Sequence, residues 1–98
     1  MKTTVVHFHK DPYDIYIGRR RDTDQHYGNP FKIDGKATRE DSIFSFRMWL
    51  TGQDFIKVEP QRRKWILDNM YKLKGKRLGC WCKPEACHGD VYAEMLEG

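Results

Sequence analysis

Short runs of apolar and β-favouring residues near the amino terminus predict two β-strands. The first run covers residues 3–8, and the second covers residues 13–18, where apolar and polar positions alternate up to Gly18. Asp11 and Pro12 lie between the runs and indicate a turn. The simplest arrangement of two strands joined in this way is a hairpin, in which they pair with each other.

Three later stretches have the spacing of apolar residues that is typical of helices. The first begins at Thr38, a candidate N-cap with an acid three residues later, and ends at Gly52. The second has Pro60 in its first turn and ends at Gly75. The third is expected over residues 88–97. We expect the large apolar residues of the first two helices to pack in the core: Ile43, Phe44, Phe46, Met48, Trp49, Leu50, Trp65, Ile66, Leu67, Met70, Tyr71 and Leu73.

A cysteine-rich stretch lies between the second and third helices and is expected to form the central strand. Residues 78–82 are largely apolar, and a loop with Pro84 leads from them to the last helix. Strand alternation places Cys80 and Cys82 on one face and Trp81 on the other. Because both faces are apolar, we expect both to be covered and Trp81 to be buried.

The order of elements, β-β-α-α-β-α, predicts an α/β protein with a single small domain over residues 1–98. We expect a mixed three- to four-stranded sheet with about three helices packed against it. The apolar runs are too short to span a bilayer. The chain has 3 cysteines, and this odd number argues against a secreted disulfide framework. These features favour a cytoplasmic protein that does not act at a membrane.

The net charge of +4 suits an anionic ligand or nucleic acid, although many proteins that bind neither carry as much. Arg19, Arg20 and Arg21 open a long polar connection over residues 19–34. Connections of this length in a compact domain are usually functional or disordered. The three arginines therefore form either a solvated basic loop or a clamp for phosphate or carboxylate, which guanidinium groups bind through two hydrogen bonds.

The start of the last helix is a candidate anion site. A strand that runs into a helix N-terminus leaves free backbone N–H groups, here those of His88, Gly89 and Asp90. The Asp90 carboxylate would hold a ribose hydroxyl or, alternatively, favour the helix dipole as a cap. The polar connection supplies further candidates for ligand binding: Arg19 and Arg20 for charge, Asn29 for amide hydrogen bonds, and Phe31 or Tyr27 for stacking.

The cysteines suggest two other kinds of site. A thiol beside a histidine at a helix N-terminus has the setting that lowers a thiol pKa, so Cys87, His88 and Asp90 are candidate catalytic residues. Alternatively, the cysteines are small buried apolar residues. Four potential zinc ligands lie close together in the sequence: Cys80, Cys82, Cys87 and His88. Their spacing is not a usual zinc pattern, so we expect no metal and no other cofactor.

Four motifs carry a resemblance to a known family: Tyr16-Ile17-Gly18-Arg19, Gly28-Asn29-Pro30-Phe31, Lys74-Gly75-Lys76 and the cysteine stretch over residues 78–91. Over residues 5–96 the chain resembles domain-of-unknown-function family 4326, which contains small bacterial and phage proteins. The resemblance implies a compact α/β domain with a pocket near these motifs, and it implies no reaction. The cysteine stretch more distantly resembles family 488, which has an arginine where this chain has Gly89.

Together these features predict a protein that binds an anionic, nucleotide-like ligand, such as a nucleotide, a nucleoside phosphate or an ADP-ribose derivative. The pocket is expected between the loop from Arg19 to Phe31 and the helix start from Cys87 to Asp90. A phage protein of this kind would act in the host cytoplasm and sequester or turn over a nucleotide signal.

Three alternatives stay open. The first is an enzyme that uses Cys87, His88 and Asp90 on a nucleotide or nucleoside. The second is a structural zinc module. The third is a nucleic-acid-binding module, because basic clusters occur at residues 19–21, 62–64 and 72–77. A solvated helix face explains the cluster at residues 62–64 equally well.

Overall fold

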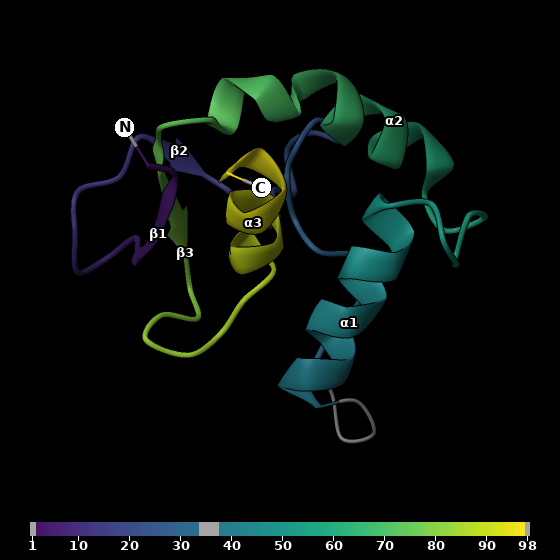
Figure 1. Ribbon diagram of the computed structural model, residues 1–98, viewed down its shortest axis with the longest axis horizontal. Coiled ribbons are helices and arrows are strands. Elements are labelled where there is room, and N and C mark those ends of the chain that lie inside the picture. Colours follow the sequence, from purple (N-terminus) through teal and green to yellow (C-terminus); the bar gives the residue numbers. More distant parts are fainter. Residues whose placement is uncertain (1, 34–37, 98) are drawn as a thin grey trace.

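The elements of the protein follow the order β-β-α-α-β-α that the sequence predicts (Figure 1). The computed structural model describes residues 2–33 and 38–97. In chain order the elements are β1 (Thr4–His7), β2 (Ile15–Tyr16), α1 (Arg39–Leu50), α2 (Pro60–Asn69), the 3-10 helix η1 (Met70–Leu73), β3 (Arg77–Cys80) and α3 (Gly89–Glu97). The predicted α/β class is confirmed.

The three strands form one parallel sheet in the order β1-β3-β2. Both outer strands pair with β3, and Val5 and Ile15 lie opposite Leu78 on either side of it. The prediction that the cysteine strand lies centrally is confirmed. The predicted hairpin of the first two strands is wrong, and the sheet is wholly parallel instead of mixed.

The connection between β1 and β2 explains this difference, because it crosses β3 instead of turning back. The Phe8 N–H donates to the Cys80 carbonyl at 3.1 Å, at one end of β3. The Asp14 N–H donates to the Arg77 carbonyl at 2.8 Å, at the other end. The chain therefore returns to the level at which β3 begins, and β2 runs in the same direction as β1.

On each face of the sheet, a glycine allows a neighbouring group to pack closely. On one face the Tyr13 ring lies over Gly79, where an added Cβ would be 2.8 Å from Tyr13 Cγ. On the other face α3 begins at Gly89, where an added Cβ would be 2.6 Å from Ile17 Cδ1. These close approaches bury Leu78, Gly79 and Cys80 of the central strand, as expected for a strand of a parallel sheet covered on both sides. Figure 1 shows α3, in yellow, between the strands and α1, and α3 contacts β1, α1 and η1.

The helix ends are held by side chains. Thr38 and Asp41 form the predicted capping box at the start of α1. At the other end, the Arg63 guanidinium donates to the carbonyls of Trp49 at 2.7 Å and Leu50 at 3.2 Å. The interpretation of residues 62–64 as a solvated face is therefore wrong for Arg63, and also for Arg62, which is buried.

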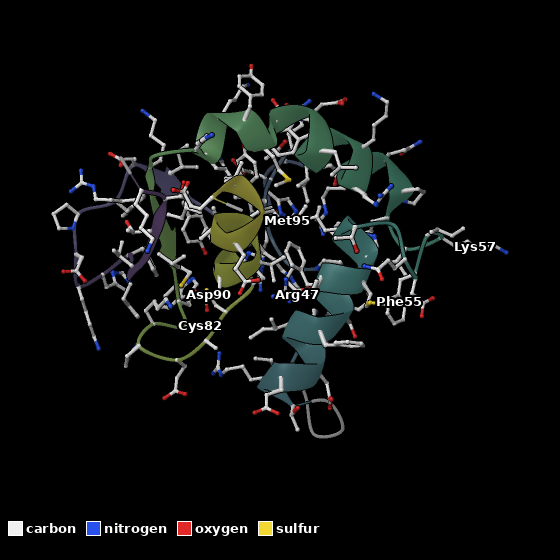
Figure 2. All side chains as sticks on the ribbon, viewed as in Figure 1. Arg47, Phe55, Lys57, Cys82, Asp90 and Met95 are labelled. Atoms are coloured by element: carbon white, nitrogen blue, oxygen red, sulfur yellow. The ribbon has the colours of Figure 1, made fainter. Side chains whose placement is uncertain are left out.

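Ion pairing joins two of the helices, and none of them is a membrane span. Arg47 of α1 pairs with Glu94 of α3 at 2.7 Å (Figure 2). Across residues 2–33 and 38–97, the helices lack the length and apolar character that crossing a membrane requires.

One core joins the sheet to the helices, and its largest fully buried side chain is Trp49. Several residues that the sequence assigned to the core are exposed instead: Phe44, Leu67, Tyr71 and Trp81. The prediction for Trp81 is wrong because β3 ends at Cys80, so strand alternation no longer fixes which way its side chain points. The Trp81 side chain is 60% exposed.

The two tryptophans give a matched test of this core. We expect Trp49→Ala to lower the free energy of unfolding by about 3–5 kcal/mol, because it empties a buried aromatic site. Trp81→Ala should cost only about 1 kcal/mol, the scale of one lost hydrogen bond. Urea denaturation of both variants measures the difference. Equal losses would contradict the placement of Trp81 at the surface.

Candidate functional site

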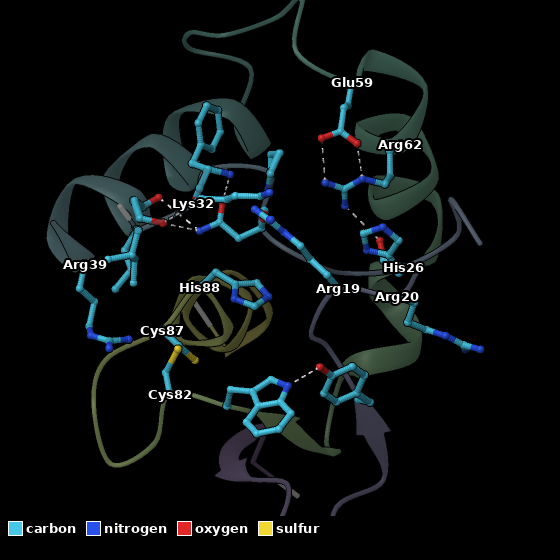
Figure 3. A pocket seen from close by; sticks show the side chains of 18 of the residues that line it. Arg19, Arg20, His26, Lys32, Arg39, Glu59, Arg62, Cys82, Cys87 and His88 are labelled. Atoms are coloured by element: carbon cyan, nitrogen blue, oxygen red, sulfur yellow. Dashed lines mark hydrogen bonds and ion pairs between the residues drawn. The ribbon is translucent and has the colours of Figure 1, made fainter. Parts of the chain in front are cut away.

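A pocket of about 1030 Å³ lies where the chain leaves β2 and β3. Because these strands are parallel neighbours, the loops that follow them open at the same edge of the sheet, where α/β proteins usually bind ligands. The pocket is lined by both segments that the sequence singled out, with Arg19, Arg20, Asn29 and Phe31 from one and Cys87 and His88 from the other. Figure 3 labels Arg19, Arg20, Cys87 and His88 among the lining side chains. Gly89 and Asp90 lie outside its lining.

One wall of the pocket is an irregular segment whose backbone carbonyls are bound by side chains. Arg62 Nη1 donates to the carbonyls of Gly28 at 2.6 Å and His26 at 3.3 Å. Arg19 Nε donates to the Asn29 carbonyl at 2.8 Å. Arg62 is itself paired with a carboxylate of Glu59, from Nε to Oε1, at 2.9 Å. Residues 26–29 are thus fixed in place without being part of a strand.

The Gly-Asn-Pro-Phe turn attaches this wall to α1. Asn29 Oδ1 accepts from the Phe31 N–H at 2.8 Å, and Asn29 Nδ2 donates to Ser42 Oγ at 2.9 Å. The Phe31 ring packs against Phe55, with centroids 4.9 Å apart, and against the edge of Trp49. Both candidate ligand contacts, the Asn29 amide and the Phe31 ring, are therefore engaged within the protein.

His88 connects the start of α3 to β2 and to this wall. Its Nε2 lies 2.8 Å from the Ile17 carbonyl and 3.1 Å from the Tyr27 carbonyl, which also accepts from the Tyr92 hydroxyl at 2.8 Å. Carbonyls only accept, so Nε2 carries the proton and Nδ1 is left as an acceptor. Burial lowers the pKa of His88 to about 4, and the ring is neutral at pH 7.

The cysteines are free thiols, two of which touch each other. The sulfur atoms of Cys80 and Cys87 are 3.2 Å apart and buried. The hydrogen bond from the Cys87 thiol lowers the pKa of Cys80 and raises that of Cys87 itself. Because its pKa is raised, Cys87 stays protonated and is not an activated nucleophile. Cys82 is half-buried and lines the pocket.

The four candidate zinc ligands do not form a metal site in this arrangement. Within the described ranges, no three His, Cys, Asp or Glu side chains are grouped so that they would hold a metal ion. His88 also uses Nε2 on backbone carbonyls.

Asp90 makes the contacts of a helix cap. Its Oδ2 accepts from the Cys87 N–H at 3.1 Å, and its Oδ1 accepts from Lys83 Nζ at 2.9 Å. The Asp90 N–H, one of the three proposed for a phosphate, donates to the Cys87 carbonyl at 3.0 Å. The capping alternative for Asp90 matches these contacts, and Gly89 serves the close packing of α3 on the sheet.

Comparison with known proteins identifies the family. Its sequence profile, described as a domain of unknown function (DUF4326), matches residues 3–98. The chain belongs to this family.

The chain is also 33% identical over 92 residues to a protein of Enterobacteria phage T4, which is described as an uncharacterized 12.4 kDa protein in the nrdA-td intergenic region. The match covers 94% of this chain and 75% of the phage protein. No solved structure matches.

In this DUF4326 chain, the pocket lining includes residues that sequence reasoning did not assign to the site, among them Tyr16, Arg39, Arg62 and Trp81. Arg39 carried a signal, because a cation in the first turn of a helix opposes the helix dipole. Its Nη1 donates to the Ala86 carbonyl at 3.2 Å and connects α1 to the loop before α3. Trp81 and Arg62 carried no local signal, since their positions depend on long-range packing.

The capping role of Asp90 predicts a stability change. Asp90→Ala should lower the free energy of unfolding by about 1–2 kcal/mol, because the Cys87 N–H loses its acceptor. Asp68, whose ion pair with Lys64 is solvent-exposed, provides the matched control. Asp68→Ala should change stability by only about 0.5 kcal/mol or less. Chemical denaturation of both variants tests this, and equal effects would speak against a cap.

His88 predicts a pH dependence of stability. Its pKa is about 4 in the folded protein, whereas the unfolded chain has the ordinary histidine value of 6.5. Between these values the unfolded chain binds a proton that the folded protein does not. The contribution of His88 to the free energy of unfolding is therefore fully present above pH 6.5. It is lost as the pH is lowered, by about 2 kcal/mol from pH 7 to pH 5.

Urea midpoints at the two pH values compare wild type with His88→Gln and His9→Gln. The first variant should lose this part of the pH dependence, whereas the second, altered at an exposed histidine, still contains His88 and should keep it. Equal pH dependence in wild type and His88→Gln would contradict the assignment.

Proposed function

We propose that the pocket binds a nucleotide-like ligand, with its base against Trp81 and its phosphate among the basic side chains. The observation that carries this proposal concerns the Trp81 side chain. It is held in one orientation by its neighbours, yet most of its surface is exposed to solvent. Trp81 Nε1 donates to the Tyr16 hydroxyl at 2.8 Å. The rings of Phe8 and His9 meet Trp81 edge-to-face, with centroids 4.3 and 5.1 Å away.

An exposed but immobilised indole is suited to base stacking. Ordering a flexible aromatic side chain on binding costs conformational entropy, and Trp81 is already ordered by these contacts. Stacking of a base on an aromatic ring is sequence-tolerant and strong, because every base offers a π-face. Trp81 thus takes the role that the sequence analysis gave to Phe31 or Tyr27.

The charge of the pocket supports a phosphate. Six cationic side chains line it: Arg19, Arg20, Arg21, Lys32, Arg39 and Arg62. In the described part of the chain, Glu59 is the carboxylate of the lining, and it is paired with Arg62. Arg19 uses Nε and Nη2 on the Asn29 carbonyl, which leaves Nη1 for another acceptor. Guanidinium groups in such an arrangement favour phosphate.

His88 lines the pocket and offers a hydrogen-bond acceptor to a ligand. Its Nδ1 has no hydrogen-bond partner among residues 2–33 and 38–97, and no fully enclosed side-chain nitrogen or oxygen there lacks a partner. Because His88 lines the pocket, Nδ1 would accept from a ligand donor such as a sugar hydroxyl or a base amine.

We propose binding instead of catalysis, because two of the candidate catalytic residues, Cys87 and Asp90, already make contacts within the protein. Cys87 faces Cys80, and Asp90 is bound to Lys83 and the Cys87 N–H. The phage relative is consistent with a protein that sequesters a nucleotide signal in an infected host cell.

A thermal-shift screen followed by calorimetry tests the proposal. We expect at least one of the four ribonucleoside 5′-monophosphates or ADP-ribose to raise the melting temperature. Trp81→Ala should then weaken binding by about tenfold, the scale of one stacked base. Tyr71→Ala, at a ring that is 70% exposed and outside the pocket, is the matched control and should bind normally.

Two exposed lysines test the phosphate contact. Lys32→Gln should weaken binding because Lys32 lines the pocket, whereas Lys57→Gln, in the loop before α2 (Figure 2), should not. The proposal fails if none of these nucleotides binds or if Trp81→Ala binds as tightly as wild type.

A further inference from the structure

We infer that a second base-binding site adjoins the first, so that the ligand is two bases joined by a phosphodiester, as in single-stranded nucleic acid. This inference rests on the proposed function and extends it. Its basis is a second pocket of about 470 Å³ that shares part of its wall with the first.

The second pocket is rich in aromatic side chains. Five of its lining residues are aromatic: Phe8, Tyr13, Tyr16, Tyr27 and Trp65. Trp65 packs on Tyr27, with centroids 4.9 Å apart, and this fixes one side of the pocket. Tyr13 is 42% exposed, and its ring lies against the backbone of Gly79. An exposed ring with one side fixed by the sheet offers the same kind of stacking surface as Trp81.

The aromatic side chains continue from one pocket to the other. Phe8 contacts Trp81 at 4.3 Å between centroids, Tyr16 at 5.3 Å and Tyr13 at 6.3 Å. Trp81 lines the first pocket, Tyr13 lines the second, and Tyr16 lines both. Successive stacking platforms along a basic groove are the means by which proteins hold single-stranded nucleic acid.

A cation lies where the link between the two bases would pass. Arg20 lines both pockets, together with Tyr16 and His26. Its guanidinium is paired with Asp22, and both side chains are more than half exposed. Exposed pairs of this kind contribute little to stability, so Arg20 can exchange Asp22 for a phosphate at small cost. Because the pockets share a wall, a short link such as one phosphodiester suits their spacing.

The test compares the four ribonucleoside 5′-monophosphates with the matching 5′-phosphorylated homodinucleotides, from pApA to pUpU, by calorimetry. At least one dinucleotide should bind about tenfold more tightly than its mononucleotide, since it adds one stacked base. Tyr13→Ala should remove this gain and leave the affinity for the mononucleotide unchanged. Tyr71→Ala should leave both affinities unchanged.

The outcomes separate this inference from the proposed function. If mononucleotides bind but no dinucleotide binds more tightly, or if the gain survives in Tyr13→Ala, the second site is wrong and the proposed function stands. If neither these probes nor ADP-ribose binds, the proposed function itself is wrong. Tighter binding of the corresponding dinucleoside pyrophosphates than of the phosphodiesters would overturn the assignment to nucleic acid and indicate a pyrophosphate-linked ligand.

Discussion

The structure depends on satisfying four consecutive backbone carbonyls, those of residues 26–29, that have no strand or helix to bond with. Arg62, Arg19 and Tyr92 donate to these carbonyls, and His88 Nε2 lies within hydrogen-bond distance of one of them. A buried carbonyl without a donor costs about 1–3 kcal/mol, so the loss of this set would remove much of the stability of so small a domain. The donors come from α2, from the chain after β2, from α3 and from the residue just before α3, and the segment joins these parts into one unit.

The same requirement accounts for two of the six cationic side chains at the pocket. Arginine meets isolated carbonyls well, because its guanidinium presents several donors in a fixed plane. Arg62 and Arg19 thus bring positive charge to the site for a structural reason, and among the described residues the Glu59 carboxylate forms its ion pair with Arg62. Arg62→Ala would therefore disturb folding and binding together, whereas side chains at the rim of the pocket, such as Lys32, separate the two effects.

Local signals in the sequence predicted the elements, because caps and periodicity act over a few residues. The capping box at Thr38 and the turn at Pro60 are of this kind. Strand pairing is not local, and nothing within residues 3–18 distinguishes a hairpin from a crossing connection. The burial of Arg62 and the exposure of Trp81 likewise depend on distant partners. The meeting of the two loops at one edge of the sheet was predictable, since parallel strands bring their following loops together, but many of the side chains that line the pocket there were not.

The glycine at the start of α3 sets the depth of the pocket. With only hydrogen at Gly89, the helix can rest directly on Ile17 and Val5, which brings the floor residue His88 within reach of two carbonyls. A single methyl group there would act as a spacer that lifts the helix start and breaks those contacts. A homologue with a bulky residue at this position must therefore seat its last helix farther from the sheet, and its pocket would have a different floor.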